Sequence, residues 1–398
     1  MKRLVPLALA AAVWLFPRPA FATFHLMTPR KPPKAPPFCP NRKCPFHSGD
    51  TTSWRYVRNG TYQTRRARPS TGVYVRSTRR YICLECKRSF SDRTFRSTYW
   101  LKRPDIFLKV ARGLVSCSGY RQLAAGLNVS PQTVARHAAR LGKQGLLFHE
   151  EMRKKKIPDE PLALDSFVSF VYSQYFPVHF HFVMGRHSHF AYGFSESEVR
   201  RSGTMRKAQK ARREVLEREL GRPDPKAREE DVAAILRIIA NGASLLDLTT
   251  DEDQAYPRAI RRSRLTVNLS TTSSKQRRTP DNPLFASNLH DLQIRHGSSN
   301  HKRETIGFSK TIQGAIERMW LHLVWKNYVK SFSEKTRGET PAQRARVTDR
   351  KWTFRDIFRR RQFPKRVGLL ARWELHFSGT IPTRVYGEVE RFPSAFAY

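Results

Sequence analysis

The fold of this chain is decided by 161-PLALDSFVSFVY-172 and by the two runs that follow it, 177-PVHFHFVMG-185 and 189-HFAYGFSES-197. All three runs are short and rich in β-branched and aromatic residues, and tight connections join them. They therefore predict three consecutive β-strands. The first run also carries an acid, Asp165, where its apolar part ends.

The segments that follow alternate between helical and extended patterns. A charged stretch of helix-forming composition precedes an apolar helix that ends at Gly242, a residue typical of the position just after a helix. Two buried strands and a further helix come next. This order predicts an α/β, ribonuclease-H-like catalytic domain at 157–330, with a charged insertion after its third strand. The segments are 204-TMRKAQKARREVLERELG-221, 231-DVAAILRIIANG-242, 244-SLLDLTT-250, 264-RLTVNLS-270 and 283-PLFASNLHDLQIRHG-297.

The chain is strongly basic, with 74 Lys and Arg against 33 Asp and Glu in 398 residues, a formal net charge of +41. The cations are spread along the whole length, which favours a polyanion that lies across several domains. A ribosome-associated or membrane-surface protein is the plainer alternative. Isolated acids at strand ends weaken the attraction for a polyanion, and their simplest use is to hold divalent metal beside phosphate. The combination predicts an enzyme that cuts or joins nucleic acid.

Three acids are predicted to meet in the catalytic domain. In this fold the first and fourth strands are neighbours, so Asp165 and Asp251 can reach one pair of Mg²⁺ or Mn²⁺ ions. Asp291, forty residues beyond Asp251 in the helix after the fifth strand, is the third candidate, and Glu317 competes with it. Glu252 and Asp253 also lie next to Asp251. The predicted phosphate contacts are Arg295, Lys302 and Arg303, whose alternative is a solvated basic face.

Four of the five cysteines form two close pairs with the pattern C-x4-C…C-x2-C, separated by a segment of hairpin length. This spacing suits a tetrahedral thiolate site for structural zinc. It predicts a zinc ribbon at 38–100, although His47 could replace one thiolate. The fifth cysteine, Cys117, is expected to be an inert buried thiol. The predicted ligands are Cys39, Cys44, Cys83 and Cys86.

A helix-turn-helix is predicted within 101–156 from 119-GYRQLAAGLNVSPQTVARHAARLG-142. Asn128, Val129 and Ser130 form the turn, with Ser130 as cap and Pro131 at the first helical position. The second helix would present its outer side chains to DNA. An ordinary helical hairpin is the alternative. The predicted DNA-facing residues are Gln132, Thr133, Arg136, His137 and Arg140.

The two ends of the chain differ in character from the middle. Residues 1–37 combine a leader, which has the charge, apolar run and Ala20-Phe21-Ala22 site of a secretory signal, with a Pro-rich linker. Because the rest of the chain has the features of a DNA-binding protein, we interpret the leader as the result of a start codon placed too far upstream. The alternative is an exported basic protein that is cleaved after Ala22. The leader is too short to span a bilayer, and no stable membrane association is expected. Residues 331–398 are basic and show few periodic elements.

These motifs, in this order, resemble bacterial insertion-sequence transposases of the DDE type that carry an N-terminal zinc ribbon. The resemblance covers about 38–330 and some of the tail. Asp291 departs from the family, where the third acid is usually Glu, and the signal-like leader is also foreign to it. The segments that carry the resemblance are CPNRKCPFH with YICLECKRSFS, RQLAAGLNVSPQTVARH, LALDSF, TTDEDQAY, and RHGSSNHKRETIGFSKT with NYVK.

The resemblance implies a nuclease and strand transferase located in the bacterial cytoplasm, on the nucleoid. Its partners would be double-stranded DNA, both the terminal inverted repeats of its element and the target, and further copies of itself on DNA. Water would be activated to nick the ends, and the freed 3′ hydroxyl would then attack the target. A non-catalytic DNA-binding regulator, or a decayed transposase that binds ends without cutting, is the competing hypothesis. It needs the cysteines and Arg136 but neither Asp165 nor Asp251.

Overall fold

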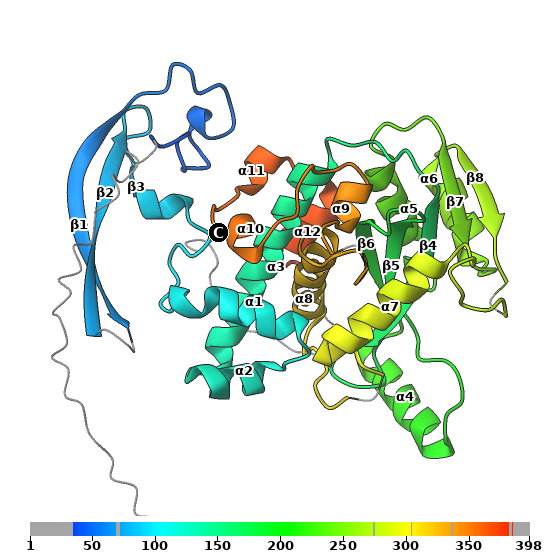
Figure 1. The fold of residues 1–398 in the computed structure, drawn as a ribbon. Coiled ribbons are helices and arrows are strands. Elements are labelled where there is room, and N and C mark those ends of the chain that lie inside the picture. Colours follow the sequence, from blue (N-terminus) through cyan, green and yellow to red (C-terminus); the bar gives the residue numbers. More distant parts are fainter. Residues whose placement is uncertain are drawn as a thin grey trace, which may run out of the picture. The chain divides into compact units, whose positions relative to one another are not determined.

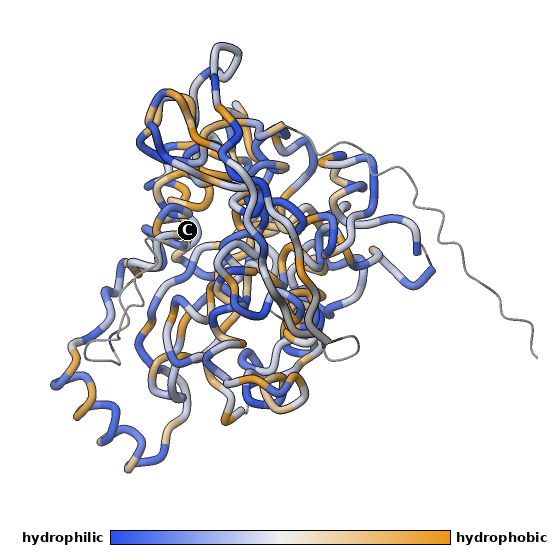
Figure 2. Tube along the Cα trace, turned by 90° about the vertical axis from the view of Figure 1, so that its left-hand side faces the viewer, coloured by the Kyte–Doolittle hydropathy of each residue, from blue (hydrophilic) through white to orange (hydrophobic). Residues whose placement is uncertain are grey.

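A computed structural model describes residues 35–68, 72–273, 275–303, 305–335, 337–381 and 384. The signal-like leader at 1–34 and the last part of the tail, 385–398, lie outside the described residues. Within the described part, no helix has the length and apolar character needed to cross a bilayer. Hydrophobic stretches, orange in Figure 2, lie mostly toward the inside of the molecule, while its projecting loops are mostly hydrophilic.

The cysteine-bearing region forms a three-stranded antiparallel sheet with its own small hydrophobic core. Strand β1 (Tyr56–Arg68) pairs with β2 (Gly72–Cys83), and β2 pairs with β3 (Ser89–Ser91). Short 3₁₀ turns flank the sheet at η1 (Pro45–His47) and η2 (Asp92–Phe95). The core contains Trp54, Tyr81 and Phe90 together with three of the cysteines. The predicted strands between the cysteine pairs are confirmed.

The helical region begins with the turn η3 (Pro104–Ile106) and α1 (Phe107–Val115). Helix α2 (Tyr120–Leu127) ends at Asn128, which adopts the left-handed conformation with φ 50°. Helix α3 (Pro131–Arg153) begins as predicted: the hydroxyl of Ser130 accepts a hydrogen bond from the backbone N–H of Thr133, and Pro131 is the first helical residue. Because α3 has 23 residues, it continues far beyond the predicted recognition segment.

The central sheet has five strands in the order β6-β5-β4-β7-β8. Strands β4, β5 and β6 are antiparallel neighbours, whereas β7 is parallel to both β4 and β8. The predicted α/β architecture is confirmed, as is the adjacency of the first and fourth strands. The bounds are β4 Leu162–Phe170, β5 Pro177–Gly185, β6 Ala191–Glu198, β7 Leu246–Thr250 and β8 Val267–Thr271.

Helices cover both faces of the sheet (Figure 1). On one face, Ser166 of β4 hydrogen-bonds to Tyr256 of α6 (Ala255–Ser263), which packs against α5 (Ala227–Ala240). On the other face, Phe182 of β5 contacts His290 of α7 (Phe285–Gly297), with ring centroids 4.5 Å apart. Helix α4 (Lys207–Leu220) occupies the predicted charged insertion and buries none of its side chains.

The C-terminal region is more ordered than its sequence suggests. Helix α8 (Ile312–Val324) continues into the single π-helical turn η5 (Trp325–Val329) and crosses α3 closely. A Cβ atom on Gly142 of α3 would lie 2.3 Å from the carbonyl oxygen of Glu317, so only glycine permits this crossing. Four short helices follow and complete the main core: α9 Pro341–Arg344, α10 Phe354–Ile357, α11 Pro364–Val367 and α12 Ala371–Ser378.

Candidate active site

Asp165 lies in the middle of β4, on the face of the sheet that α7 covers. It pairs across the ladder with Phe182, and directly paired residues share a face, so Asp165 is on the side of His290 rather than that of Tyr256. One carboxylate oxygen accepts a hydrogen bond of 2.6 Å from the N–H of Ser166. Burial raises the pKa of Asp165 to about 6, and the negative charge of Asp251 acts in the same direction.

Asp251 is the first residue after β7, and the parallel register of β7 with β4 places it level with Asp165, in the middle of β4. Its Oδ1 accepts a hydrogen bond of 3.0 Å from the N–H of Asp253. Burial raises the pKa of Asp251, and the nearby charge of Asp253 adds to this. Asp253 itself accepts from the N–H of Ala255 and pairs with Arg228 at 2.7 Å, so it holds the start of α6 in place.

Asp291 lies on α7, and its carboxylate is close enough to Asp165 for the two charges to interact. Burial raises the pKa of Asp291 to about 7, followed by the charge of Asp165, while Arg295, Arg278 and Arg303 oppose the rise. Glu317, the competing third acid, is buried in the crossing of α8 with α3. Burial raises its pKa, and the groups that oppose this are Lys143 and Gln313. Asp291, and not Glu317, is therefore the acid that the fold couples to Asp165.

The charges of the three aspartates affect one another, but their carboxylate oxygens do not form a compact ligand cluster. Among the described residues, only the four cysteines bring three or more potential ligand atoms within 4.8 Å of one another. The carboxylate donors suit Mg²⁺ or Mn²⁺ chemically, because hard divalent ions prefer oxygen ligands. Burial is the main cause of their raised pKa values, and a bound cation would favour the ionised carboxylates.

Arg278 is a residue of this site that the sequence interpretation missed. Its guanidinium is exposed, and its charge opposes the raised pKa of both Asp165 and Asp291. The loop that carries it is fixed at both ends: the N–H of Thr272 donates to Thr250, and the side chain of Asn282 donates to the carbonyl of Arg277 at 2.9 Å. No periodic pattern marks such a loop, so only the fold reveals the proximity.

The three predicted phosphate contacts occupy different environments. Arg295 stacks on Phe167 of β4, with 4.5 Å between its guanidinium carbon and the ring centroid, and donates weakly to the carbonyl of Val168. Arg303 is exposed, and its charge acts on Asp291. Lys302 is exposed as well, but it is not among the groups that shift the pKa of Asp291.

The four cysteines fit a zinc ion. The sulfur atoms of Cys39 and Cys86 are 3.6 Å apart, and those of Cys44 and Cys83 are 3.9 Å apart. A tetrahedron with Zn–S bonds of about 2.3 Å requires sulfur separations of about 3.8 Å. All are free thiols, and the cluster indicates a structural zinc site. The backbone N–H of Cys86 and the indole of Trp54 favour the thiolate of Cys83 and lower its pKa to about 7, against the opposing effect of burial.

His47 is not part of this cluster. Its Nδ1 lies 2.9 Å from the carbonyl oxygen of Cys39, and its ring packs against Phe38 and Phe363. The ring is fully buried and helps to join the ribbon to the C-terminal region. The group of converging sulfur atoms includes Cys44, the ligand for which His47 was the alternative.

The predicted DNA-facing surface of α3 is only partly exposed. Gln132 and Arg136 are exposed and Thr133 is half-buried. The expectation that His137 and Arg140 face outward is wrong, since each is only 2% exposed. Arg140 donates to the carbonyls of Ser97 and Tyr99, and His137 packs against Phe107. The chain before α1 and the helix α1 itself cover this part of α3.

Comparison with solved structures finds a match to a chain of the cryo-electron microscopy structure of the simian T-cell lymphotropic virus intasome in complex with PP2A regulatory subunit B56 gamma. The match has 13% sequence identity and a TM-score of 0.23, and it covers 59% of this chain and 71% of that chain. No protein-family model matches the chain, and neither does any curated protein. Because the TM-score is low, the fold assignment is based on the strand order of the sheet.

Proposed function

We propose that this chain is a DDE-type transposase, which binds DNA ends and catalyses metal-dependent strand cleavage followed by strand transfer. One observation carries the proposal: Asp251, directly after β7, is level with Asp165 on the neighbouring strand β4, and α7, which carries Asp291, packs against β4. The motifs that resemble insertion-sequence transposases support it. Asp291 stands where that family usually has Glu, and it is our choice for the third acid.

Each residue of the proposed site has a defined task. Asp165, Asp251 and Asp291, which are all half-buried, would hold the divalent ions. Two such ions, when bound, activate the attacking oxygen and stabilise the leaving 3′ oxygen. The guanidinium groups of Arg278 and Arg303 would bind the phosphate, because Arg forms two parallel hydrogen bonds to it.

The N-terminal regions would deliver the DNA. Gln132 and Arg136 are the exposed predicted residues at the start of α3, where a recognition helix contacts base edges. Ser130 and Pro131 fix this end of the helix, so its exposed side chains are presented from a rigid support. The zinc ribbon would contribute further phosphate contacts from its basic surface.

The test is Mg²⁺-dependent nicking of a DNA duplex that carries an end of the element. We expect Asp165→Asn and Asp251→Asn to lower the nicking rate about a thousandfold or more, since metal stabilisation of the reaction is worth several kcal/mol. Glu252→Gln, next to Asp251 but exposed, is the matched control and should retain full activity. Glu317→Gln tests the competing third acid and should leave nicking within a few-fold of the wild type.

Two results would contradict the proposal. Unchanged nicking in both aspartate variants would eliminate this site. Binding of DNA by a wild-type protein that never nicks it, at any concentration of Mg²⁺ or Mn²⁺, would favour the non-catalytic DNA-binding protein or a decayed transposase.

A further inference from the structure

We propose that helix α4 and its flanking segments, residues 199–226, are an arm that binds the phosphate backbone of duplex DNA beside the active site. This inference rests on the proposed function, because it names the partner of the same reaction. The arm is an insertion between β6 and α5. None of its helical side chains is buried, so packing on the sheet does not explain why the helix is there.

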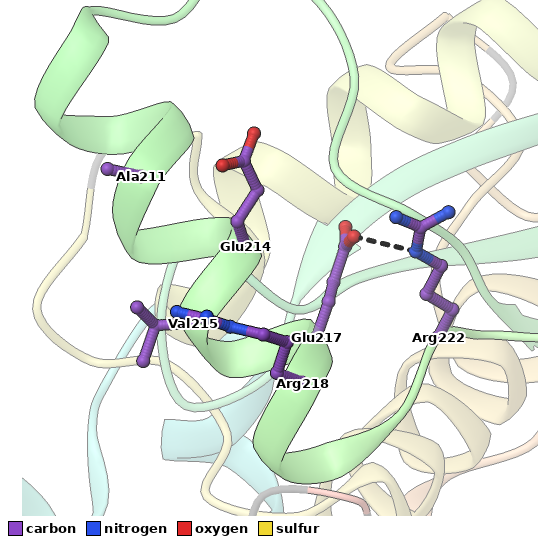
Figure 3. Close-up of a pocket in the computed structure, with 6 residues that line it drawn as sticks. All are labelled: Ala211, Glu214, Val215, Glu217, Arg218 and Arg222. Carbon is purple, nitrogen blue, oxygen red and sulfur yellow. Dashed lines mark ion pairs between the residues drawn. The ribbon is translucent and has the colours of Figure 1, made fainter.

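An ion cluster at the base of the arm ties helix α4 to the two segments that flank it. Glu217 of α4 accepts from Arg200 at 2.8 and 3.0 Å, lies 3.3 Å from Arg213, and pairs with Arg222 at 2.9 Å. Figure 3 shows Glu217 and Arg222 pointing toward one another across the hollow that α4 forms with the segment after it. Three guanidinium groups around one carboxylate leave a local excess of positive charge. An isolated helix of this length is marginal in water, and this cluster supplies the support that a hydrophobic face normally would.

The outer side of the helix carries an excess of cations. Apart from the base cluster, α4 exposes four cations and only two acids, Glu214 and Glu219. Lys207, Lys210 and Arg218 lie on one side of the helix at spacings of i, i+3 and i+11. They make no ion pair with any described residue. The row formed by these three side chains is about 16 Å long, which is enough to contact phosphates on both sides of the roughly 12 Å wide major groove. The four cations are Lys207, Lys210, Arg212 and Arg218.

The arm leaves the sheet in the direction in which the strands that carry the acids run, but further along. Strands β4, β6 and β7 all point the same way, and through Val178 the end of β6 at Glu198 is level with Ser169, four residues beyond Asp165 on β4. Two strand spacings, about 10 Å, separate the ends of β4 and β6. Arg201 at the start of the arm stacks on Tyr175 and donates to the carbonyl of Gln174 in the β4–β5 turn.

Further cations connect the arm to the acids. The segment after α7 returns beside β4, where Val171 and Ser309 form a β-bridge and the N–H of Tyr172 donates to the carbonyl of Ser309. This contact places Lys310 over the ring of Tyr172, at 5.4 Å from its centroid. Arg303, whose charge acts on Asp291, is in the same segment. Lys310 and Arg201 thus lie beside the β4–β5 turn and Arg303 acts on Asp291, so a duplex that reacts at the acids would meet these cations on its way to the arm.

The test measures how salt weakens binding of the full-length protein to a duplex of mixed sequence, roughly 30 base pairs or three helical turns long. Binding is measured without added Mg²⁺, so it does not depend on nicking. Replacing Lys207, Lys210 and Arg218 together by Gln should lower the slope of log K against log salt by about 2 to 3, since each phosphate contact contributes about 0.9. These side chains are exposed, so the fold should be unaffected, and circular dichroism checks this.

A control variant carries the same loss of charge elsewhere, with Gln at Lys335, Arg355 and Arg359, which are exposed cations of the C-terminal region. Its slope should change by less than 1. An equal fall in both variants would assign the effect to net charge and overturn the proposal. Glu214→Gln removes an acid from the arm's outer face and should tighten binding. Glu217→Gln also removes an acid but loosens the base of the arm, and it should weaken binding.

An unchanged slope in the arm variant would overturn the proposal, whatever the nicking assay gives. If this variant instead changed the sedimentation of the free protein, the surface would be a contact between copies of the chain, and DNA would not be its partner. Failure of the proposed function has a different signature: the wild type would not nick DNA, while the salt dependence of the arm variant would still report on binding.

Discussion

The four cysteines of the ribbon and the three aspartates of the sheet differ in how far the fold itself brings their donor atoms together. The sulfur atoms already lie at the separations of a zinc tetrahedron: those of Cys39 and Cys86 are 3.6 Å apart, and those of Cys44 and Cys83 are 3.9 Å apart. The carboxylates interact through their charges but do not form an equally compact group. The cysteine site is preformed, whereas the carboxylate site that we propose would be completed by its metal ions.

The reason for the difference lies in the elements that carry the donors. Cys83 and Cys86 are on one tight turn after β2, and Cys39 and Cys44 flank a second turn, so each pair is fixed locally. Each aspartate comes from a different part of the fold: a strand interior, a strand end and a helix. Burial raises the pKa of all three, and an arginine, Arg278, supplies part of the missing counter-charge. An incomplete carboxylate site suits an enzyme whose metals and DNA assemble together.

The largest effect is expected from breaking the preformed site. Structural zinc contributes on the order of 10 kcal/mol in small metal-dependent folds. Cys83→Ser should therefore lose zinc and unfold the segment 38–100, seen as rapid proteolysis there while the sheet remains protected. Cys117→Ser, at the cysteine outside the cluster, should retain one zinc per chain by metal analysis. Stoichiometric zinc in the Cys83 variant would contradict the four-thiolate site.

A smaller effect is expected from neutralising the buried carboxylate of Asp165. The folded state raises this pKa from 3.8 to about 6, so the ionised group opposes folding above that range. Without divalent metal, Asp165→Asn should be more stable than the wild type near pH 7.5, by on the order of 1 to 3 kcal/mol in urea unfolding. The difference should vanish below about pH 3, where the wild-type carboxyl is protonated in both states.

The exposed acid Asp247 provides the control for this experiment. Asp247→Asn should change the unfolding free energy little at either pH, because this side chain lies on the surface. Addition of Mg²⁺ should then stabilise the wild type and not Asp165→Asn, since a ligand stabilises only the state that binds it. Equal stabilisation of both proteins would show that the ion binds elsewhere.

The smallest effect is expected at Arg278, whose positive charge would both attract the DNA phosphate and compete with the metal ions. Arg278→Gln should raise the DNA concentration needed for half-maximal nicking about tenfold, on the order of 1 kcal/mol. The same change should lower the Mg²⁺ concentration needed, because the metal no longer competes with a fixed cation. The neighbouring exposed Arg277, replaced by Gln, is the control. Opposite shifts confined to Arg278 would support the assignment, and a parallel loss in both variants would reject it.

The sequence predicts local features of this chain better than contacts between layers. The succession of strands and helices along the chain, the Ser130 cap and the cysteine pairs depend on neighbouring residues, and the structure contains each of them. The outward placement of His137 and Arg140 was wrong because periodicity places side chains on a helix but does not reveal what covers it. Arg140 finds its partners at Ser97 and Tyr99, some forty residues earlier in the chain.

The choice between the two candidate third acids has the same origin. Asp291 and Glu317 both lie on helices, forty and sixty-six residues beyond Asp251, and the sequence favours Asp291 because the helix of Glu317 is apolar, yet it leaves Glu317 as a competitor. The packing of α7 against β4 brings Asp291 near Asp165. Helices α3 and α8 cross at Gly142, and this contact holds Glu317 beside Lys143. Arg278 lies in a loop without a repeating pattern, so its place near the acids depends on the folded sheet alone.

The convergence of Asp165, Asp251 and Asp291 on shared metal ions is tested most directly by iron-mediated cleavage of the polypeptide. With Fe²⁺ in place of Mg²⁺, and with ascorbate and peroxide, the backbone breaks close to the bound ion. We predict fragments that end near residues 165, 251 and 291 in the wild type, and none of them in Asp165→Asn. Cleavage near residue 317 in place of 291, or near only one of the three aspartates, would contradict a shared site.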